Sequence, residues 1–335
     1  MWKKDWYMMQ NIVEKIYDKI LPKADYMIIC PNAPDYGFFA HFLNICGDLN
    51  AAIRGGYKPY IDMKTYKSIF ITKQEVGEIN AWEQYFLQPF PELEDNLKNL
   101  QNAKFKMRIK KNYYVLKKRN EVRKIIQIMD FPTAFVRPND SMEFLTNESE
   151  ISYWRNLVRT YVKVNQDTLK HITYLKKDIK FTSEDKVLGV LVRGTDFINK
   201  KPYNHPIPPT PEEALDKVYT VMKAYKCNKV YLATEDQGVF NYFQENLGKS
   251  LIFVPQKRYV NTGTTCLNDV YEKENVDLHQ LGLDYIATIL LLSECDCLVA
   301  ARTSGAVAAL LLSPGYQYVY FWNKGRYSKN EYMLK

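Results

Sequence analysis

The sequence predicts an α/β protein built on parallel sheets, and two observations carry that prediction. The second half of the chain alternates short apolar runs with segments of helical periodicity. Its apolar runs are continuous, which is typical of strands that helices cover on both faces of a sheet. The chain has 335 residues, of which 46% are apolar, enough for two domains of ordinary size.

The first half opens as strand, helix and strand. Residues 25–32 form a short apolar run that predicts a buried strand. Residues 38–56 carry apolar side chains at helical spacing and end in two glycines, which predicts a helix with a defined stop. Residues 57–63 predict a second strand, so this half also begins in the α/β pattern.

The rest of the first half predicts mainly helices. Residues 1–21 have the periodicity of an amphipathic helix, and residues 75–180 are expected to be mostly helical and charged. Within them we expect one long helix over 149–179, interrupted at most at Asn165-Gln166-Asp167. The predicted organisation is therefore an N-terminal domain, 1–180, and a C-terminal domain, 181–335.

The second half alternates regularly between strands and helices. Thr210, Pro211 and Glu213 form the start signal of its first helix, with Glu213 completing a capping box. Strands are predicted at 186–192, 229–234, 250–255, 295–301 and 316–322. Helices are predicted at 210–225, 238–248, 284–294 and 304–313.

The net charge of +8 is concentrated in one segment, residues 104–124, with ten Lys and Arg against one Glu. Such a surface can contact nucleic acid, anionic lipid or a phosphorylated ligand, and it can also be a solvated helix face. Because no recognised nucleic-acid module accompanies the charge, nucleic acid ranks below a membrane surface or a phosphorylated ligand.

The six cysteines include no Cys-x-x-Cys pair, and no histidine stands at zinc-ligand spacing from any of them. This pattern favours free thiols in a reducing cytoplasm. No apolar run reaches the length of a membrane span. The sequence also lacks the motifs of α/β-hydrolases, zincins, P-loop proteins and dinucleotide-binding oxidoreductases.

The candidate site lies where the strands of the second half end, because ligands of open parallel sheets bind beyond the carboxyl ends of the strands. An arginine there can grip phosphate with two hydrogen bonds, and a helix N-terminus also binds phosphate. The alternatives are a plain helix cap, an ion pair between Arg193 and Asp196, and carboxylates that only cap a helix. The polar residues at these strand ends are Arg193, Thr195, Asp196, Thr234, Glu235, Asp236, Arg302, Thr303, Ser304 and Gly305.

Three motifs, spanning about 187–312, resemble signatures of the fucosyltransferase superfamily that includes α1,2- and α1,6-fucosyltransferases, the nodulation fucosyltransferase and protein O-fucosyltransferases. "GVLVRGTDF" is similar to the first signature, a strand running into His-x-Arg-Arg-x-Asp. "VYLATEDQGVF" is similar to the second, a strand ending in Ala-Thr-Asp-Asp. "ECDCLVAARTSGAVAALL" is similar to the third, a Thr/Ser-Ser turn that opens a helix. "YGFFAHFLNICGDLNAAIRGGYKPYID" also resembles the superfamily's opening helix and strand.

The resemblance implies a GT-B fold, with two Rossmann-like domains whose parallel sheets face a cleft. It implies an inverting, metal-independent glycosyltransferase that needs no cofactor and takes fucose from GDP-fucose. On the donor side it implies roles for the diphosphate-binding Arg193, the signature Asp196, the acidic pair Glu235 and Asp236, the turn Thr303-Ser304, and a guanine-recognising Asp284. From their place at the same strand ends, we add Thr195, Arg302 and Gly305 as donor-binding candidates. As acceptor-side candidates we take Gly37 and His41, on the N-terminal helix that is expected to face the cleft. We add His205 in the Pro-rich loop 200–210, which can also be a rigid connector.

The sequence departs from this pattern at two positions. Leu191 stands where the signature has His, and Gly194 stands where it has a second Arg. Candidates for a replacement cation are Lys200, Lys201, Lys257 and Arg302. The candidate general bases, in order of preference, are Asp196, Glu235 and His41.

Two other functions remain open at this point: a GT-B transferase that uses another nucleotide sugar, and an inactive homologue that binds a sugar or nucleotide. A metal-dependent GT-A enzyme is disfavoured, since the acidic pair of Glu294–Asp296 precedes a strand instead of following one. For a bacterial enzyme we expect a surface-glycan acceptor on a lipid carrier, with 104–124 contacting the anionic inner face of the plasma membrane.

Overall fold

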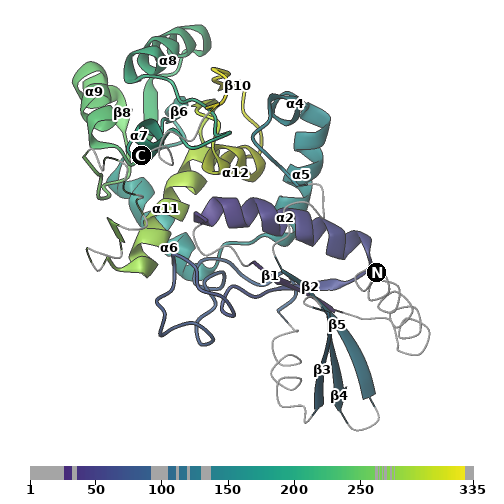
Figure 1. The fold of residues 1–335 in the computed structure, drawn as a ribbon. Coiled ribbons are helices and arrows are strands. Elements are labelled where there is room, and N and C mark those ends of the chain that lie inside the picture. Colours follow the sequence, from purple (N-terminus) through teal and green to yellow (C-terminus); the bar gives the residue numbers. More distant parts are fainter. Residues whose placement is uncertain are drawn as a thin grey trace.

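The computed structural model describes residues 26–31, 36–91, 105–110, 113–118, 121–129, 137–260 and 276–328, with six residues of the loop between the last two, 263, 265, 267, 270, 271 and 274 (Figure 1). Side chains are described in these ranges except at Tyr26, Asp196, Phe197 and the strands between 105 and 129. The helix expected at 1–21 and Cys266 lie outside the described residues.

The C-terminal half contains the parallel sheet that the sequence predicts. Its strand order is β10-β9-β6-β7-β8, and every neighbouring pair is parallel. The strands are β6 (Val187–Leu191), β7 (Lys229–Ala233), β8 (Leu251–Ile252), β9 (Cys297–Ala300) and β10 (Tyr318–Phe321). The central strand, β6, is buried along its whole length.

Helices cover both faces of this sheet. Leu188 and Val190 pack in a cluster with α8 (Pro211–Tyr225) and α9 (Gln237–Leu247). Val187 and Leu191 face the other way, in a cluster with α11 (Leu278–Ser293) and α12 (Ser304–Leu312). Alternate residues of one strand thus serve two cores, which explains the continuous apolar run. The predicted helix at 284–294 begins earlier, after the cap Asp277.

The N-terminal half contains a second sheet of order β2-β1-β5-β4-β3. β1 (Tyr26–Cys30) is parallel to β2 (Lys58–Ile61) and to β5 (Glu121–Met129). β4 (Tyr113–Lys118) is antiparallel to β5 and to β3 (Phe105–Lys110). This sheet is therefore only partly parallel, a correction to the expectation of two parallel sheets.

The expectation of a mostly helical middle is wrong between 105 and 129, where the chain forms strands β3, β4 and β5. The basic segment 104–124 consequently lies largely on strands and not on a helix face. In β3, "FKMRIK", apolar and basic residues alternate with the period of a strand. Figure 1 shows these three strands extending away from the rest of the molecule.

The long helix expected over 149–179 is two helices, α5 (Glu148–Tyr161) and α6 (Gln166–Asp178), preceded by the short α4 (Met142–Leu145). Asn165 explains the break. Its side chain caps α6 by accepting from Thr168 N, and its amide donates to the carbonyls of Glu83 and Gln84 at 3.0 and 2.9 Å. These bonds to a distant loop hold Asn165 out of the helix.

The two halves share one apolar core. A single cluster of buried side chains includes Phe39 and Phe42 of α2 (Phe38–Arg54), Trp154 of α5, Ile289 of α11 and Val307 of α12. α12 is apolar on all sides, as expected for a helix that packs against α11 of the C-terminal half and also against α2 and α5 (Figure 1).

The described cysteines are free and buried, as the sequence predicts: Cys30, Cys46, Cys227, Cys295 and Cys297. In the described ranges, no helix is both long and apolar enough to cross a membrane.

Candidate functional site

The turn after β6 is held by the acidic pair after β7. The amide of Gly194 donates to Glu235 Oε1 at 3.1 Å, and the amide of Thr195 donates to Asp236 Oδ2 at 2.8 Å. The Thr195 hydroxyl also donates to Glu235 Oε1 at 3.2 Å. Thr195 has φ of 50°, a strained conformation for a β-branched residue that these bonds stabilise. The first two motifs are thus joined into one rigid unit.

Gly194, where the resemblance would place a second arginine, lies against Asp236, so a side chain there would force its surroundings to shift. A Cβ at Gly194 would lie 2.3 Å from Asp236 Oδ2 and 2.7 Å from Asp236 Cβ. Asp236 is itself fixed, since its Oδ1 accepts from Val239 N at 2.9 Å and caps α9. Glycine at residue 194 therefore has a steric reason in this chain.

Arg193 extends beside Glu235. Its Nε lies 3.8 Å from Glu235 Oε1, and about a third of its side chain (31%) is exposed. The open alternative of an ion pair with Asp196 falls on a side chain outside the described residues; α7 (Asp196–Lys200) begins there. Arg193 thus combines an ion pair with an exposed surface at the edge of the sheet.

Two tyrosines lie near this ion pair. Burial raises the pKa of Tyr285 to about 12; Arg193 opposes the rise and Glu235 adds to it. Burial also raises the pKa of Tyr271 above its usual range; Tyr259 and Glu235 add to the rise and Arg193 opposes it. Both phenols therefore stay protonated near neutral pH and can donate hydrogen bonds.

The N-terminus of α12 completes this edge. Thr303 caps the helix, because its hydroxyl accepts from Ala306 N at 3.2 Å. Ser304 and Gly305 follow as the first helical residues. The first amides of a helix have no acceptor within it, so they and the helix dipole favour an anion at this place.

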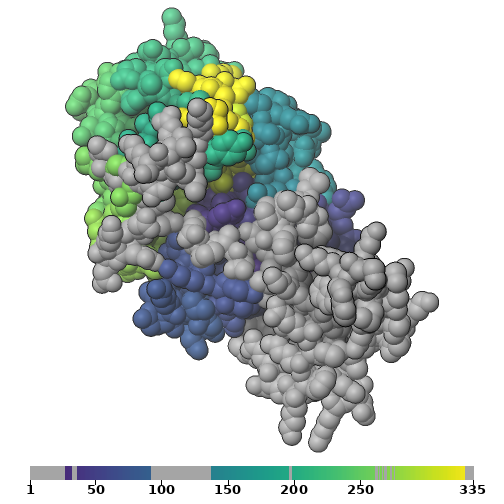
Figure 2. Space-filling model, viewed as in Figure 1, coloured from purple at the N-terminus to yellow at the C-terminus, as the bar shows by residue number. Residues whose placement is uncertain are grey.

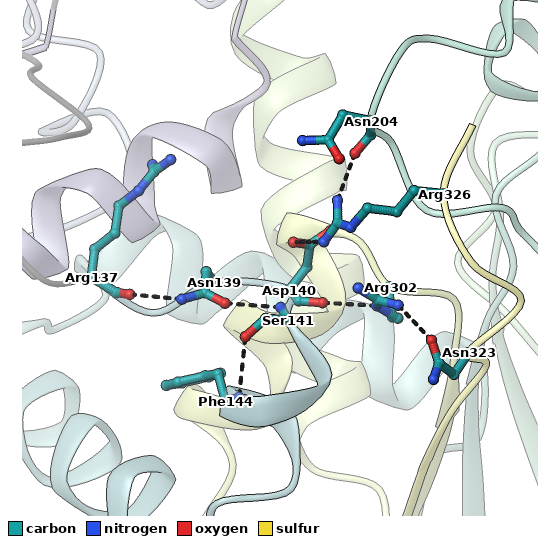
Figure 3. Close-up of polar contacts among 9 residues, drawn as sticks. All are labelled: Arg137, Asn139, Asp140, Ser141, Phe144, Asn204, Arg302, Asn323 and Arg326. Atoms are coloured by element: carbon teal, nitrogen blue, oxygen red, sulfur yellow. Dashed lines mark hydrogen bonds and ion pairs between the residues drawn. The ribbon is translucent and has the colours of Figure 1, made fainter. Parts of the chain in front are cut away.

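Arg302 turns toward the linker before α4 (Figure 3). Its Nε donates to the Asp140 carbonyl at 2.8 Å, and its NH1 donates to Asn323 Oδ1 at 2.9 Å. The Asp140 carboxylate pairs with Arg326 at 2.8 Å, and Arg326 donates to the carbonyl of Asn204 at 2.6 Å. Figure 3 shows both arginines converging on Asp140. Arg302 is 7% exposed, so its guanidinium is buried where it makes these hydrogen bonds.

The other candidate cations differ in their surroundings. Lys257 pairs with Glu274. Lys200 and Lys201 lie at the end of α7, with Lys201 at φ of 45°. The role of these three lysines as a second cation stays a prediction.

Asp284, on α11, contacts helix α6. Its Oδ1 lies 3.0 Å from His171 Nε2 and accepts from Gln280 Nε2 at 2.8 Å. These contacts connect α11 to α6, so the carboxylate expected to recognise guanine is engaged between helices. That role also stays a prediction.

The acceptor-side candidates lie in two places. Gly37 is the N-cap of α2, and His41 is buried one turn later, its ring 5.8 Å from that of Tyr36. His205 is exposed in a loop whose backbone pairs with the segment around Arg326. Figure 2 shows atoms of the α2 region (purple) recessed between the C-terminal half (green and yellow) and the α4–α5 segment (teal).

Several residues near the site were missed by sequence reasoning. Asp140, Asn323 and Arg326 are far from the motifs in sequence, and nothing in their surroundings marks them. Tyr285 resembles an ordinary apolar position of its helix. Tyr259 pairs by its backbone with Glu235 and Gln237, and its hydroxyl is buried without a hydrogen-bond partner in the part of the chain that the structure describes.

Among the described side chains, no group of three or more His, Cys, Asp or Glu residues is arranged to hold a metal ion.

No protein-family model and no curated protein matches the sequence. Solved structures that match this chain include the fucosyltransferase NodZ from Bradyrhizobium, at 15% identity and a TM-score of 0.49 over 88% of this chain and 95% of that one. POFUT1 in complex with GDP is 9% identical, with a TM-score of 0.48 over 89% and 98%. Arabidopsis thaliana FUT1 in complex with GDP is 11% identical, with a TM-score of 0.47 over 92% and 73%. Likeness at this level does not by itself imply a shared activity.

Proposed function

We propose that this protein is an inverting, metal-independent glycosyltransferase that transfers fucose from GDP-fucose to a hydroxyl of a bacterial surface glycan. One observation carries the proposal: the ends of β6, β7 and β9 present the three motifs at one sheet edge. There Arg193 is partly exposed beside Glu235, and α12 begins at Ser304 after its cap Thr303. A cation and a helix N-terminus at one edge suit a sugar diphosphate.

In the proposed reaction the diphosphate leaves as negative charge develops on it. Arg193 stabilises that charge through its guanidinium, and the first amides of α12 do so through hydrogen bonds. Glu235 orients Arg193 and holds the turn that carries it. Preorganised groups of this kind are effective because they need not reorient during the reaction.

A general base removes the proton of the acceptor hydroxyl while the bond to the anomeric carbon forms. We assign this role to Asp196, at the start of α7. Glu235 ranks second because its Oε1 already accepts from Gly194 and Thr195. His41 ranks third; it lies on the α2 side, and its ring is almost fully buried.

The donor is tested by a thermal-shift measurement in the presence of EDTA, with GDP and UDP compared. We expect GDP to raise the melting temperature and UDP not to. A shift with UDP alone would support a transferase that uses another nucleotide sugar. No shift with either nucleotide would refute the assignment.

Transfer itself is tested by GDP release from GDP-fucose, slow to water and faster with an acceptor glycan. Arg193→Ala is expected to abolish release without changing the fold, whereas the exposed Arg159→Ala serves as the matched control. GDP binding without release in the wild-type protein would favour the inactive homologue.

The base is tested by Asp196→Asn, with the exposed Asp216→Asn on α8 as its control. We expect transfer to fall by about 100-fold or more, since a positioned base contributes roughly 10²–10⁴ in rate. Normal turnover would move the role to Glu235 or His41.

For location we propose the cytoplasm, with contact at the inner face of the plasma membrane through 104–124. The acceptor would then be a glycan on a lipid carrier. The concentration of Lys and Arg in this segment supports the proposal, because each basic residue near an anionic surface contributes about 1 kcal/mol.

A further inference from the structure

Tyr285 places a phenol hydroxyl against the first turn of α12. A Cβ at Gly305 would lie 3.1 Å from the Tyr285 hydroxyl oxygen. A side chain at residue 305 would therefore compete with the hydroxyl for space. The hydroxyl thus lies at the helix end that the proposed function assigns to the β-phosphate.

The ring of Tyr285 is held by the N-terminal half. It packs edge-on against Phe39 of α2, with ring centroids 5.1 Å apart and planes at 80°. Phe39 is fully buried, so the partner surface is part of the core. A ring supported in this way presents its hydroxyl at a fixed position, which lowers the entropic cost of a hydrogen bond to a ligand.

The hydroxyl also lies within electrostatic reach of Arg193 and Glu235, since both charges act on it. Within the described part of the chain, the Tyr285 hydroxyl makes no hydrogen bond. It is a protonated donor near neutral pH at the start of a helix, within reach of the Arg193 charge, which the Glu235 carboxylate partly offsets. The hydroxyl, the helix start and Arg193 each favour an anion.

We propose that the Tyr285 hydroxyl donates a hydrogen bond to the β-phosphate of the nucleotide donor, together with Arg193 and the α12 N-terminus. The inference rests on the proposed function and adds a binding residue to it. It also identifies a neutral donor that acts where Gly194 leaves no room for a second arginine.

The test compares wild-type protein with Tyr285→Phe by titration calorimetry with GDP and with GMP. A hydrogen bond to a charged group corresponds to about a 10- to 100-fold change in affinity. We expect GDP to bind Tyr285→Phe about 10-fold or more weakly, while GMP, which has no β-phosphate, binds both proteins alike. Tyr174→Phe, on an exposed tyrosine of α6, is the control for removal of a hydroxyl.

The outcomes separate this inference from the function on which it rests. GDP binding that is strong in wild type and unchanged in Tyr285→Phe overturns the role of Tyr285 and leaves the transferase intact. An equal loss of GDP and GMP affinity also overturns it, because that pattern indicates a general structural effect. A wild-type protein that binds neither GDP nor UDP overturns both.

A second variant makes the test independent of the hydroxyl's removal. Gly305→Ala introduces a Cβ that pushes the Tyr285 hydroxyl aside by a few tenths of an ångström, so GDP affinity should fall, by less than in Tyr285→Phe. In the Tyr285→Phe background the same change should cost at least threefold less, because the displaced group is absent. Fully additive losses would overturn the coupling.

Discussion

Gly194→Ala is expected to destabilise the protein strongly although it adds one methyl group. The new Cβ would meet Oδ2, Cγ and Cβ of Asp236 at 2.3, 2.6 and 2.7 Å. All three atoms belong to a short side chain, so the contact cannot be relieved by moving a flexible end. Either Asp236 or the turn at Thr195 must shift.

The cost follows from the two bonds that hold Asp236. Its Oδ2 accepts from Thr195 N at 2.8 Å, and a hydrogen bond to a charged group contributes about 1.5–3 kcal/mol. Its Oδ1 caps α9 at Val239 N, and such a cap contributes about 1 kcal/mol. Replacing glycine by alanine restores about 0.4–1 kcal/mol through the unfolded chain. The net loss is roughly 2–3 kcal/mol.

Urea unfolding followed by circular dichroism measures this loss, with the slope m compared to exclude a changed unfolded state. Gly238→Ala is the matched control: it lies in α9, and its Cβ would meet Asp236 Oδ1 at 3.2 Å, a contact that a small shift relieves. We expect that control to stay within about 1 kcal/mol of wild type, since alanine favours a helix. A Gly194→Ala protein within about 0.5 kcal/mol of wild type would refute the steric argument.

Three further predictions concern other parts of the chain. Asp140→Ala should lower stability by about 1 kcal/mol, because the partly exposed Arg326 loses its partner; an unchanged melting curve would contradict this. Burial raises the pKa of Tyr85 and of Tyr231, so the stability that each contributes is present below pH 10 and is lost as the pH rises above it. The free energy of unfolding should then fall by about 1.4 kcal/mol per group and pH unit. Urea unfolding at pH 9 to 11 measures this loss, and a flat profile would refute it. Sedimentation with anionic vesicles should pull down the protein through 104–124 and weaken with salt; equal binding to neutral vesicles would count against the membrane contact.

The C-terminal half was predictable because its signals are local. Each of these signals lies within a short stretch of the sequence: the continuous apolar strands, the Thr210–Glu213 capping box and the turns rich in polar residues. The parallel-sheet rule then brings Arg193, Glu235 and Thr303 to one edge without any knowledge of packing.

What sequence reasoning missed depends on contacts between distant segments. The orientation of the Arg302 side chain is set by its hydrogen bond to the carbonyl of Asp140, in the segment before α4. The break at Asn165 is set by a loop about eighty residues earlier. In β3 to β5 the density of charge hid the alternation that marks a strand. In the first two cases the contact that determines the structure comes from a distant segment. In the third, the alternation of apolar residues was obscured by the charged ones.

The apolar helix α12 limits how this molecule can open. Swinging the two halves apart would strip α2 and α5 from α12 and expose residues such as Trp154 and Val307 to water. A close-packed interior resists bending of that kind. Calorimetry is therefore expected to record one unfolding transition. A chain cut near 180 should yield two fragments that dissolve only when they are expressed together.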